Sequence, residues 1–139
     1  MTTRPLFFLL VLAAVTGACG SEEDLRDPVW GYISPVIIQP NCATSSCHSK
    51  GAAVAGLDLS TAQAGYNSLM AQKLPPVMGG QPTRSSVTRR LVTPGNPTES
   101  RIVNMMRAYG APRMPPDRPL SEADIALVEQ WILAGANND

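Results

Sequence analysis

A short tract, Cys42-Ala43-Thr44-Ser45-Ser46-Cys47-His48, constrains the fold of this chain more than any other feature. It contains the only histidine among the 139 residues and two of the three cysteines. In an oxidising compartment, two neighbouring cysteines are expected to be paired or chemically occupied. The fold must therefore accommodate whatever these three side chains bind.

The composition gives the chain little material for a core. Both phenylalanines, Phe7 and Phe8, lie near the amino terminus, and the chain has 13 prolines and 11 glycines. Small domains that are short of core usually add a disulfide, a metal or another staple. A large, flat and apolar cofactor would supply the missing core.

The tract favours attachment of a haem. Its thiols can form thioethers to the haem vinyl groups, and its imidazole can bind the iron. The usual attachment motif has two residues between the cysteines, whereas four separate Cys42 from Cys47. Residues five apart are turned by about 140° around a regular helix, so the insert has to leave the helix. Its Thr and Ser residues can satisfy their own backbone in turns.

Two other interpretations of the tract stay open. A Cys42–Cys47 disulfide beside a chance histidine is plausible in an exported protein. Zinc is a poorer alternative, because structural zinc sites use four nitrogen or sulfur ligands and the tract offers three.

A six-coordinate haem iron also needs a second axial ligand, and methionine is the obvious donor, as in cytochromes c. Met114 is preferred, because prolines on both sides stiffen its loop and reduce the entropy lost in holding one shape. Met78, in a glycine-rich loop, is the second candidate. Three more methionines lie on apolar stripes of predicted helices, where methionine more often fills a core: Met70, Met105 and Met106.

Residues 1–18 are expected to be a secretory signal rather than part of the fold. Their apolar run, Leu6 to Val15, is too short to span a bilayer comfortably. Small residues before Cys19 resemble a bacterial lipobox, which predicts lipidation of Cys19; ordinary signal cleavage nearby is the alternative. Residues 19–28 are polar and acidic and suit a solvated tether. The formal net charge of zero gives no case for nucleic-acid binding.

The remainder, residues 29–139, is expected to be all-α, with four helical segments and no sheet. Ser34-Pro35 is expected to supply the N-cap and the first helical position of the first helix. Asp27-Pro28 is an alternative, earlier start, and Pro40 is expected to end or kink the segment. A capping box at Ser60–Gln63 opens a second helix to about Ala71.

A third helix is predicted from Asn96-Pro97-Thr98-Glu99, with an apolar stripe that ends at Tyr109 before Gly110. Ser121 is expected to cap the last helix, whose stripe includes Trp131. Tyr109 and Trp131 are expected to pack in the core. Two arginines flank Met114 and are expected to be solvated, with pairing to haem propionates as the alternative: Arg113 and Arg118.

The order of these motifs resembles the small class I cytochrome c domains of planctomycete and myxobacterial type. The resemblance rests on Cys47-His48, Gly56–Ser60, Val92–Ser100, Met114-Pro115-Pro116 and the segment Trp131–Ala136. It implies a cytochrome c-like fold of about four helices around the haem, with the first and last helices packed crosswise. It also implies one covalent haem c, with thioethers at Cys42 and Cys47 and with His48 and Met114 as axial ligands.

The expected protein is therefore an exported, lipid-anchored monohaem cytochrome of the periplasm or cell envelope. It would carry single electrons between unidentified redox partner proteins and would not be an enzyme in its own right. Two alternatives remain: a gas sensor in which Met114 leaves the sixth iron position open, and a haem-free lipoprotein adaptor stapled by a Cys42–Cys47 disulfide.

Overall fold

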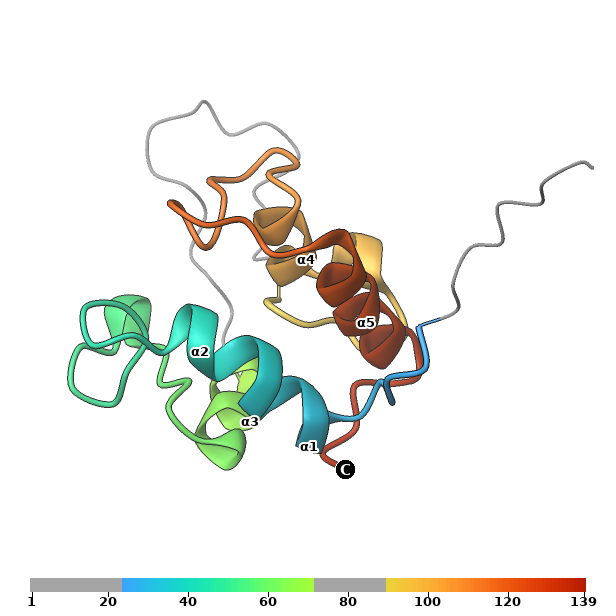
Figure 1. Cartoon of the computed structure of the whole chain (residues 1–139), viewed down its shortest axis with the longest axis horizontal. Coiled ribbons are helices and arrows are strands. Elements are labelled where there is room, and N and C mark those ends of the chain that lie inside the picture. The colour runs from blue at the N-terminus through green and yellow to red at the C-terminus, as the bar shows by residue number, and fades with distance from the viewer. Residues whose placement is uncertain (1–23, 72–89) are drawn as a thin grey trace, which may run out of the picture.

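A computed structural model of the chain describes residues 24–71 and 90–139 (Figure 1). These residues form helices and loops and contain no strand, which confirms the predicted all-α class. Cys19 and Met78 lie outside the described residues. No helix in the described ranges is long and apolar enough to cross a membrane.

The first helical stretch runs from Trp30 to Cys42 as three consecutive segments: α1 (Trp30–Ile33), a π-helical segment (Ser34–Ile38) and α2 (Gln39–Cys42). Pro40 has no N–H, and its ring would clash with a carbonyl one turn earlier in a regular α-helix. A π turn, in which the Gln39 N–H donates to the Ser34 carbonyl, directly precedes it. The helix is therefore widened before Pro40 and continues to Cys42.

The predicted cap at Ser34 is wrong, because Ser34 is fully buried inside this stretch. The helix begins at Trp30, closer to the alternative start at Asp27-Pro28. Its first N–H groups are satisfied by the far end of the chain: the Trp30 N–H donates to Asp139 Oδ1 (3.0 Å) and the Gly31 N–H to the Asp139 carbonyl (2.6 Å). The capping group thus comes from a residue 109 positions away, which local sequence cannot indicate.

The later helices follow the predicted segments with small shifts. Helix α3 spans Ala62–Ala71, and its cap is Thr61 rather than Ser60, since the Ala64 N–H donates to Thr61 Oγ1 (3.2 Å). Asn96 caps a single 3-10 turn, Pro97–Glu99. The helical conformation is interrupted at Ser100, whose backbone is extended, and α4 (Arg101–Met106) begins after it.

The last helix, α5 (Glu122–Leu133), is capped by Ser121 as predicted, because the Ser121 hydroxyl accepts the Asp124 N–H. The expectation that Tyr109 packs in the core is wrong: α4 ends at Met106, and Tyr109 is 66 % exposed. The apolar stripe of α4 is therefore one turn shorter than the sequence pattern predicts.

The core centres on two tryptophans from the first and last helices. Trp30 and Trp131 stack with ring centroids 4.9 Å apart, and both are 1 % exposed. Their indole N–H groups are satisfied by the backbone carbonyls of Ala62 and Asn137, each at 2.8 Å. This stack joins α1 to α5, while α3 packs against Trp30 through Tyr66.

Candidate ligand cavity

The tract leaves the helix at its first cysteine. Cys42 is the last residue of α2, and the next four residues form a turn in which the Cys47 N–H donates to the Thr44 carbonyl (3.0 Å). The His48 N–H then donates to the Cys42 carbonyl (3.1 Å), which closes the loop. The insert bulges as its spacing predicts, and this hydrogen bond joins the backbone of the histidine to that of the first cysteine.

A hydrogen bond from the imidazole ring of His48 to the backbone fixes the orientation of the ring. His48 Nδ1 lies 2.9 Å from the Val54 carbonyl oxygen. A carbonyl only accepts hydrogen bonds, so Nδ1 carries the proton and the lone pair of a neutral ring lies on Nε2. Metal-ligating histidines are commonly oriented in this way by their second nitrogen.

The loop that supplies this carbonyl has an uncommon backbone. Ala53 (φ 40°) and Ala55 (φ 58°) on either side of Val54 are both left-handed, a conformation that costs a non-glycine residue about 1–2 kcal/mol. Between them, the Val54 N–H donates to the Cys47 carbonyl (3.0 Å) while the Val54 carbonyl accepts from His48. The strained loop thus holds both residues of the Cys-His pair. Sequence reasoning missed Val54, because a backbone acceptor leaves no residue-type signal.

A cavity of about 310 Å³ opens beside the tract, within the usual size range of ligand pockets. Cys42, Cys47 and His48 line it together. Most of its remaining wall is apolar and comes from the loop after the tract, from α3, from α4 and from the chain before α4: Val54, Leu57, Leu59, Leu69, Leu91 and Ile102. Such a wall offers apolar contacts to whatever the cavity holds.

Met114 lines the same cavity as His48, together with Pro115 and Pro116. The Met114 N–H donates to the Met105 carbonyl (3.0 Å), which ties this loop to α4. The structure therefore brings together the two residues predicted as axial ligands, although they lie far apart in sequence.

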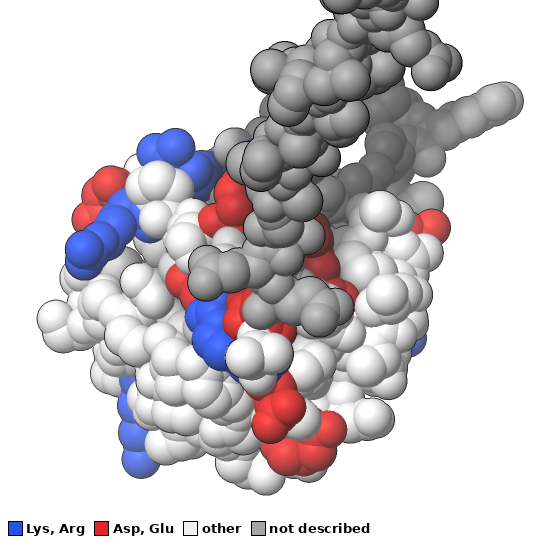
Figure 2. All heavy atoms as spheres, turned by 45° about the vertical axis from the view of Figure 1, so that its right-hand side comes forward, with Lys and Arg blue, Asp and Glu red and all other residues white. Residues whose placement is uncertain are grey.

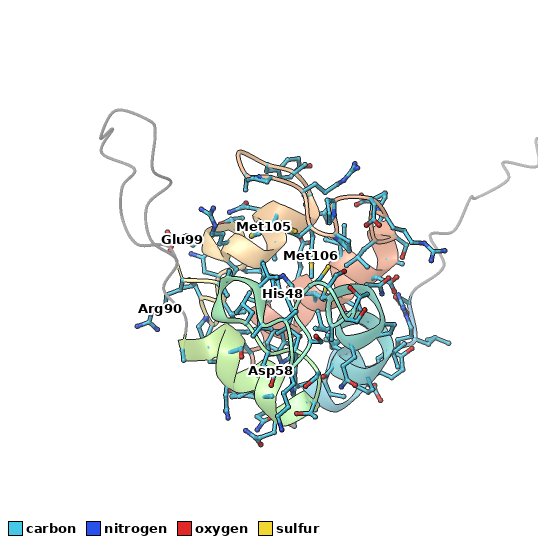
Figure 3. The ribbon with its side chains drawn as sticks, turned by 90° about the vertical axis from the view of Figure 1, so that its left-hand side faces the viewer. His48, Asp58, Arg90, Glu99, Met105 and Met106 are labelled. Carbon is cyan, nitrogen blue, oxygen red and sulfur yellow. The ribbon has the colours of Figure 1, made fainter. Side chains whose placement is uncertain are left out.

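Met105 and Met106 also line the cavity, and Figure 3 shows them on α4 near the loop that carries His48. Met106 is buried, and Met105 is partly buried against the core, so both fill the core as predicted while forming part of the cavity wall. Met70 packs against the core without lining the cavity.

The two thiols are free in the structure and are not joined as a disulfide. Burial raises the pKa of the Cys42 thiol to about 11, and the neighbouring Cys47 adds to the rise. Cys42 is therefore a neutral thiol at pH 7. Within residues 24–71 and 90–139, no three histidine, cysteine or acidic side chains converge on a point where a metal ion could bind.

The two arginines near Met114 face solvent, whereas Asp117 of the same loop lines the cavity. Arg113 and Arg118 are exposed, and Arg113 donates to the Pro116 carbonyl at 3.1 Å. Neither arginine lines the cavity. Their exposure agrees with the prediction that both side chains are solvated. The face shown in Figure 2 is mostly uncharged, with acidic and basic side chains interspersed on it.

The residues of the cavity fit a covalently attached haem. They include two free thiols, an imidazole with its Nε2 available and a methionine thioether, set in a largely apolar wall. A haem does not require its attachment and axial groups to converge on one point, because thioethers form at the edge of the ring and axial ligands bind at its centre. Comparison of the chain with protein-family models, with curated proteins and with solved structures gives no significant match.

Proposed function

We propose that the cavity holds one covalently attached haem c and that the protein carries single electrons. The observation that supports this most directly is the hydrogen bond from His48 Nδ1 to Val54 (2.9 Å). It leaves Nε2 as a metal ligand in an apolar cavity that Cys42, Cys47 and Met114 also line.

Each of the four residues has a role in this proposal. Cys42 and Cys47 would form thioethers to the two vinyl groups, His48 would bind the iron through Nε2, and Met114 would supply the second ligand to the iron. A bound haem would supply an iron that changes between its ferric and ferrous states. Methionine with histidine ligation and an apolar surround both raise the reduction potential of such an iron.

The described packing is compatible with a cytochrome c-like fold. The first and last helices meet through the Trp30–Trp131 stack, and the cavity is walled by α3, α4 and the loops on both sides. We propose a carrier that exchanges electrons with partner proteins and does not act as an enzyme alone.

The amino-terminal sequence supports export and anchoring. We propose that residues 1–18 are removed and that Cys19 becomes a lipidated first residue in the periplasm or cell envelope. Intact-mass measurement of the purified chain tests this, since cleavage before Cys19 together with acylation gives a mass that no other processing gives.

Mass spectrometry also tests the haem. The full chain is produced in a host that matures c-type cytochromes, and its mass is measured after denaturation and solvent extraction, which remove non-covalent haem. We expect one haem mass per chain. Cys42→Ala or Cys47→Ala alone should leave one thioether and keep this mass, whereas the double variant should lose it. Wild-type chain that lacks the haem mass in such a host contradicts the proposal.

A further inference from the structure

The last part of the predicted tether is bound to the folded domain. Arg26 Nη1 donates to Asp124 Oδ1 (2.5 Å) in the first turn of α5, and Arg26 Nη2 donates to Asp24 Oδ2 (2.6 Å). The Arg26 and Asp124 side chains are 29 % and 27 % exposed, so the contact is partly shielded from water. The tether predicted over residues 19–28 is therefore attached to the domain at Arg26 while this ion pair holds.

The ion pair sets how far the domain can move from an anchor on Cys19. From Cys19 to Arg26 the chain spans seven residues, which reach at most about 24 Å when fully extended. Without the ion pair, the chain from Cys19 to Val29, just before α1, could reach at most about 34 Å. The Arg26–Asp124 pair thus shortens the maximum reach of the tether by about 10 Å.

The side chain next to Arg26 is apolar and unshielded. Leu25 is 92 % exposed, the most exposed of the large hydrophobic side chains in the described ranges. It is six residues from Cys19. A bilayer interface lowers the free energy of such a side chain by covering its apolar surface, so Leu25 favours contact between this part of the domain and lipid.

The tract lies at the other end of the molecule from the start of the described chain. In Figure 1 residues 24–29 lie beside α5, whereas the end of α2 and the loop that follows it lie on the far side. A domain held close to the bilayer at Arg26 would therefore point the tract away from the bilayer.

We propose that the Arg26–Asp124 ion pair orients the anchored protein, with the first turn of α5 and Leu25 against a phospholipid bilayer and the tract end toward the aqueous phase. This inference rests on the lipid anchor of the proposed function. It assigns Arg26 a positioning role: a soluble redox partner would then reach the tract without contacting the membrane.

The test compares two added cysteines in the full lipidated holoprotein on phosphatidylcholine–phosphatidylglycerol vesicles. Ala123→Cys reports on the first turn of α5, and Ala52→Cys reports on the loop after His48; both positions are exposed. The native cysteines carry lipid or thioethers, so a bulky polyethylene-glycol maleimide modifies the added one. We expect vesicles, relative to detergent, to slow modification at position 123 by about fivefold and to leave position 52 unchanged, since a bilayer excludes bulky reagents from side chains near its headgroups.

Arg26→Ala should remove most of this difference, and so should high salt, which screens a partly exposed ion pair. Arg118→Ala, which removes an equally positive but solvated side chain, should leave the difference intact. Leu25→Ser should reduce protection at position 123, whereas Val36→Ser, at another exposed apolar residue, should not.

The outcomes separate this inference from the proposed function. Equal protection of both positions in lipidated wild-type protein, or protection that survives Arg26→Ala, overturns the orientation alone. A chain without lipid on Cys19 overturns the anchor and the orientation together. Lipidated protein that shows the expected protection but carries no haem overturns the electron-carrier proposal and leaves the orientation standing.

Discussion

The imidazole of His48 donates its Nδ1 proton to the carbonyl of Val54, and the two groups are 2.9 Å apart. A further backbone hydrogen bond, from the Leu59 N–H to the His48 carbonyl (2.8 Å), holds the same residue from the other side. The ring therefore has one tautomer and one orientation before any ligand binds. An imidazole that is held in one orientation is what a histidine-ligated iron requires.

His48→Ala should remove the proximal ligand without detaching the haem. The two thioethers do not depend on the imidazole, so intact mass should still show one haem per chain, while the low-spin visible spectrum disappears. The variant is compared with Ser49→Ala, which alters the neighbouring residue and should keep the wild-type spectrum. A His48→Ala protein with an unchanged low-spin spectrum is incompatible with His48 as the iron ligand.

Met114→Ala should open the sixth iron position. We expect a lower reduction potential, because a methionine ligand raises it, and we expect the reduced variant to bind carbon monoxide. Met70→Leu is the matched control, since Met70 is partly buried outside the cavity wall. If only Met78→Ala gives this result, the ligand is Met78. If the reduced wild type already binds carbon monoxide, the gas-sensor interpretation is correct.

The Cys42 thiol should be slow to alkylate in folded, haem-free protein. The thiolate is the reactive form, and burial raises the pKa of Cys42 to about 11. In a Cys47→Ser background, the iodoacetamide rate should be low at pH 8 and should rise as the pH approaches 11. Urea-unfolded protein should reach its full rate at lower pH. Equal pH profiles for the folded and unfolded chains would show that Cys42 is not shielded.

Gly65→Ala should destabilise the fold through the tryptophan pair. A Cβ at position 65 would lie 3.2 Å from Trp30 Cζ2. Trp30 cannot move away easily, because it is hydrogen-bonded to Ala62 and stacked on Trp131. Overpacking of this kind costs about 1–3 kcal/mol, measurable by urea unfolding. Gly51→Ala is the control, since a Cβ there meets nothing within 4 Å and should cost no stability.

Structural features that are set by neighbouring residues could be predicted from the sequence, and features that are set by distant residues could not. The Ser121 cap and the bulged insert follow from residues within a few positions of one another, and both predictions are confirmed. The start of the first helix could not be predicted in this way, because Asp139 caps it from the opposite end of the chain. Tyr109 is exposed because α4 ends three residues earlier, which the apolar stripe did not indicate.

The candidate site shows the same division. Side-chain chemistry identified Cys42, Cys47, His48 and Met114, which line one cavity in the structure. The Val54 carbonyl and the left-handed alanines beside it could not be found, because backbone groups are common to every residue. The contribution of Met105 and Met106 to the cavity wall depends on tertiary packing, which helical periodicity alone does not specify.

The most direct test of the central claim is the visible spectrum of the exported protein after reduction, with the protein produced in a host shown to mature c-type cytochromes. We expect the sharp absorption bands of a low-spin haem, and we expect this haem to stay with the chain after denaturation. Intact but colourless protein from that host would contradict it.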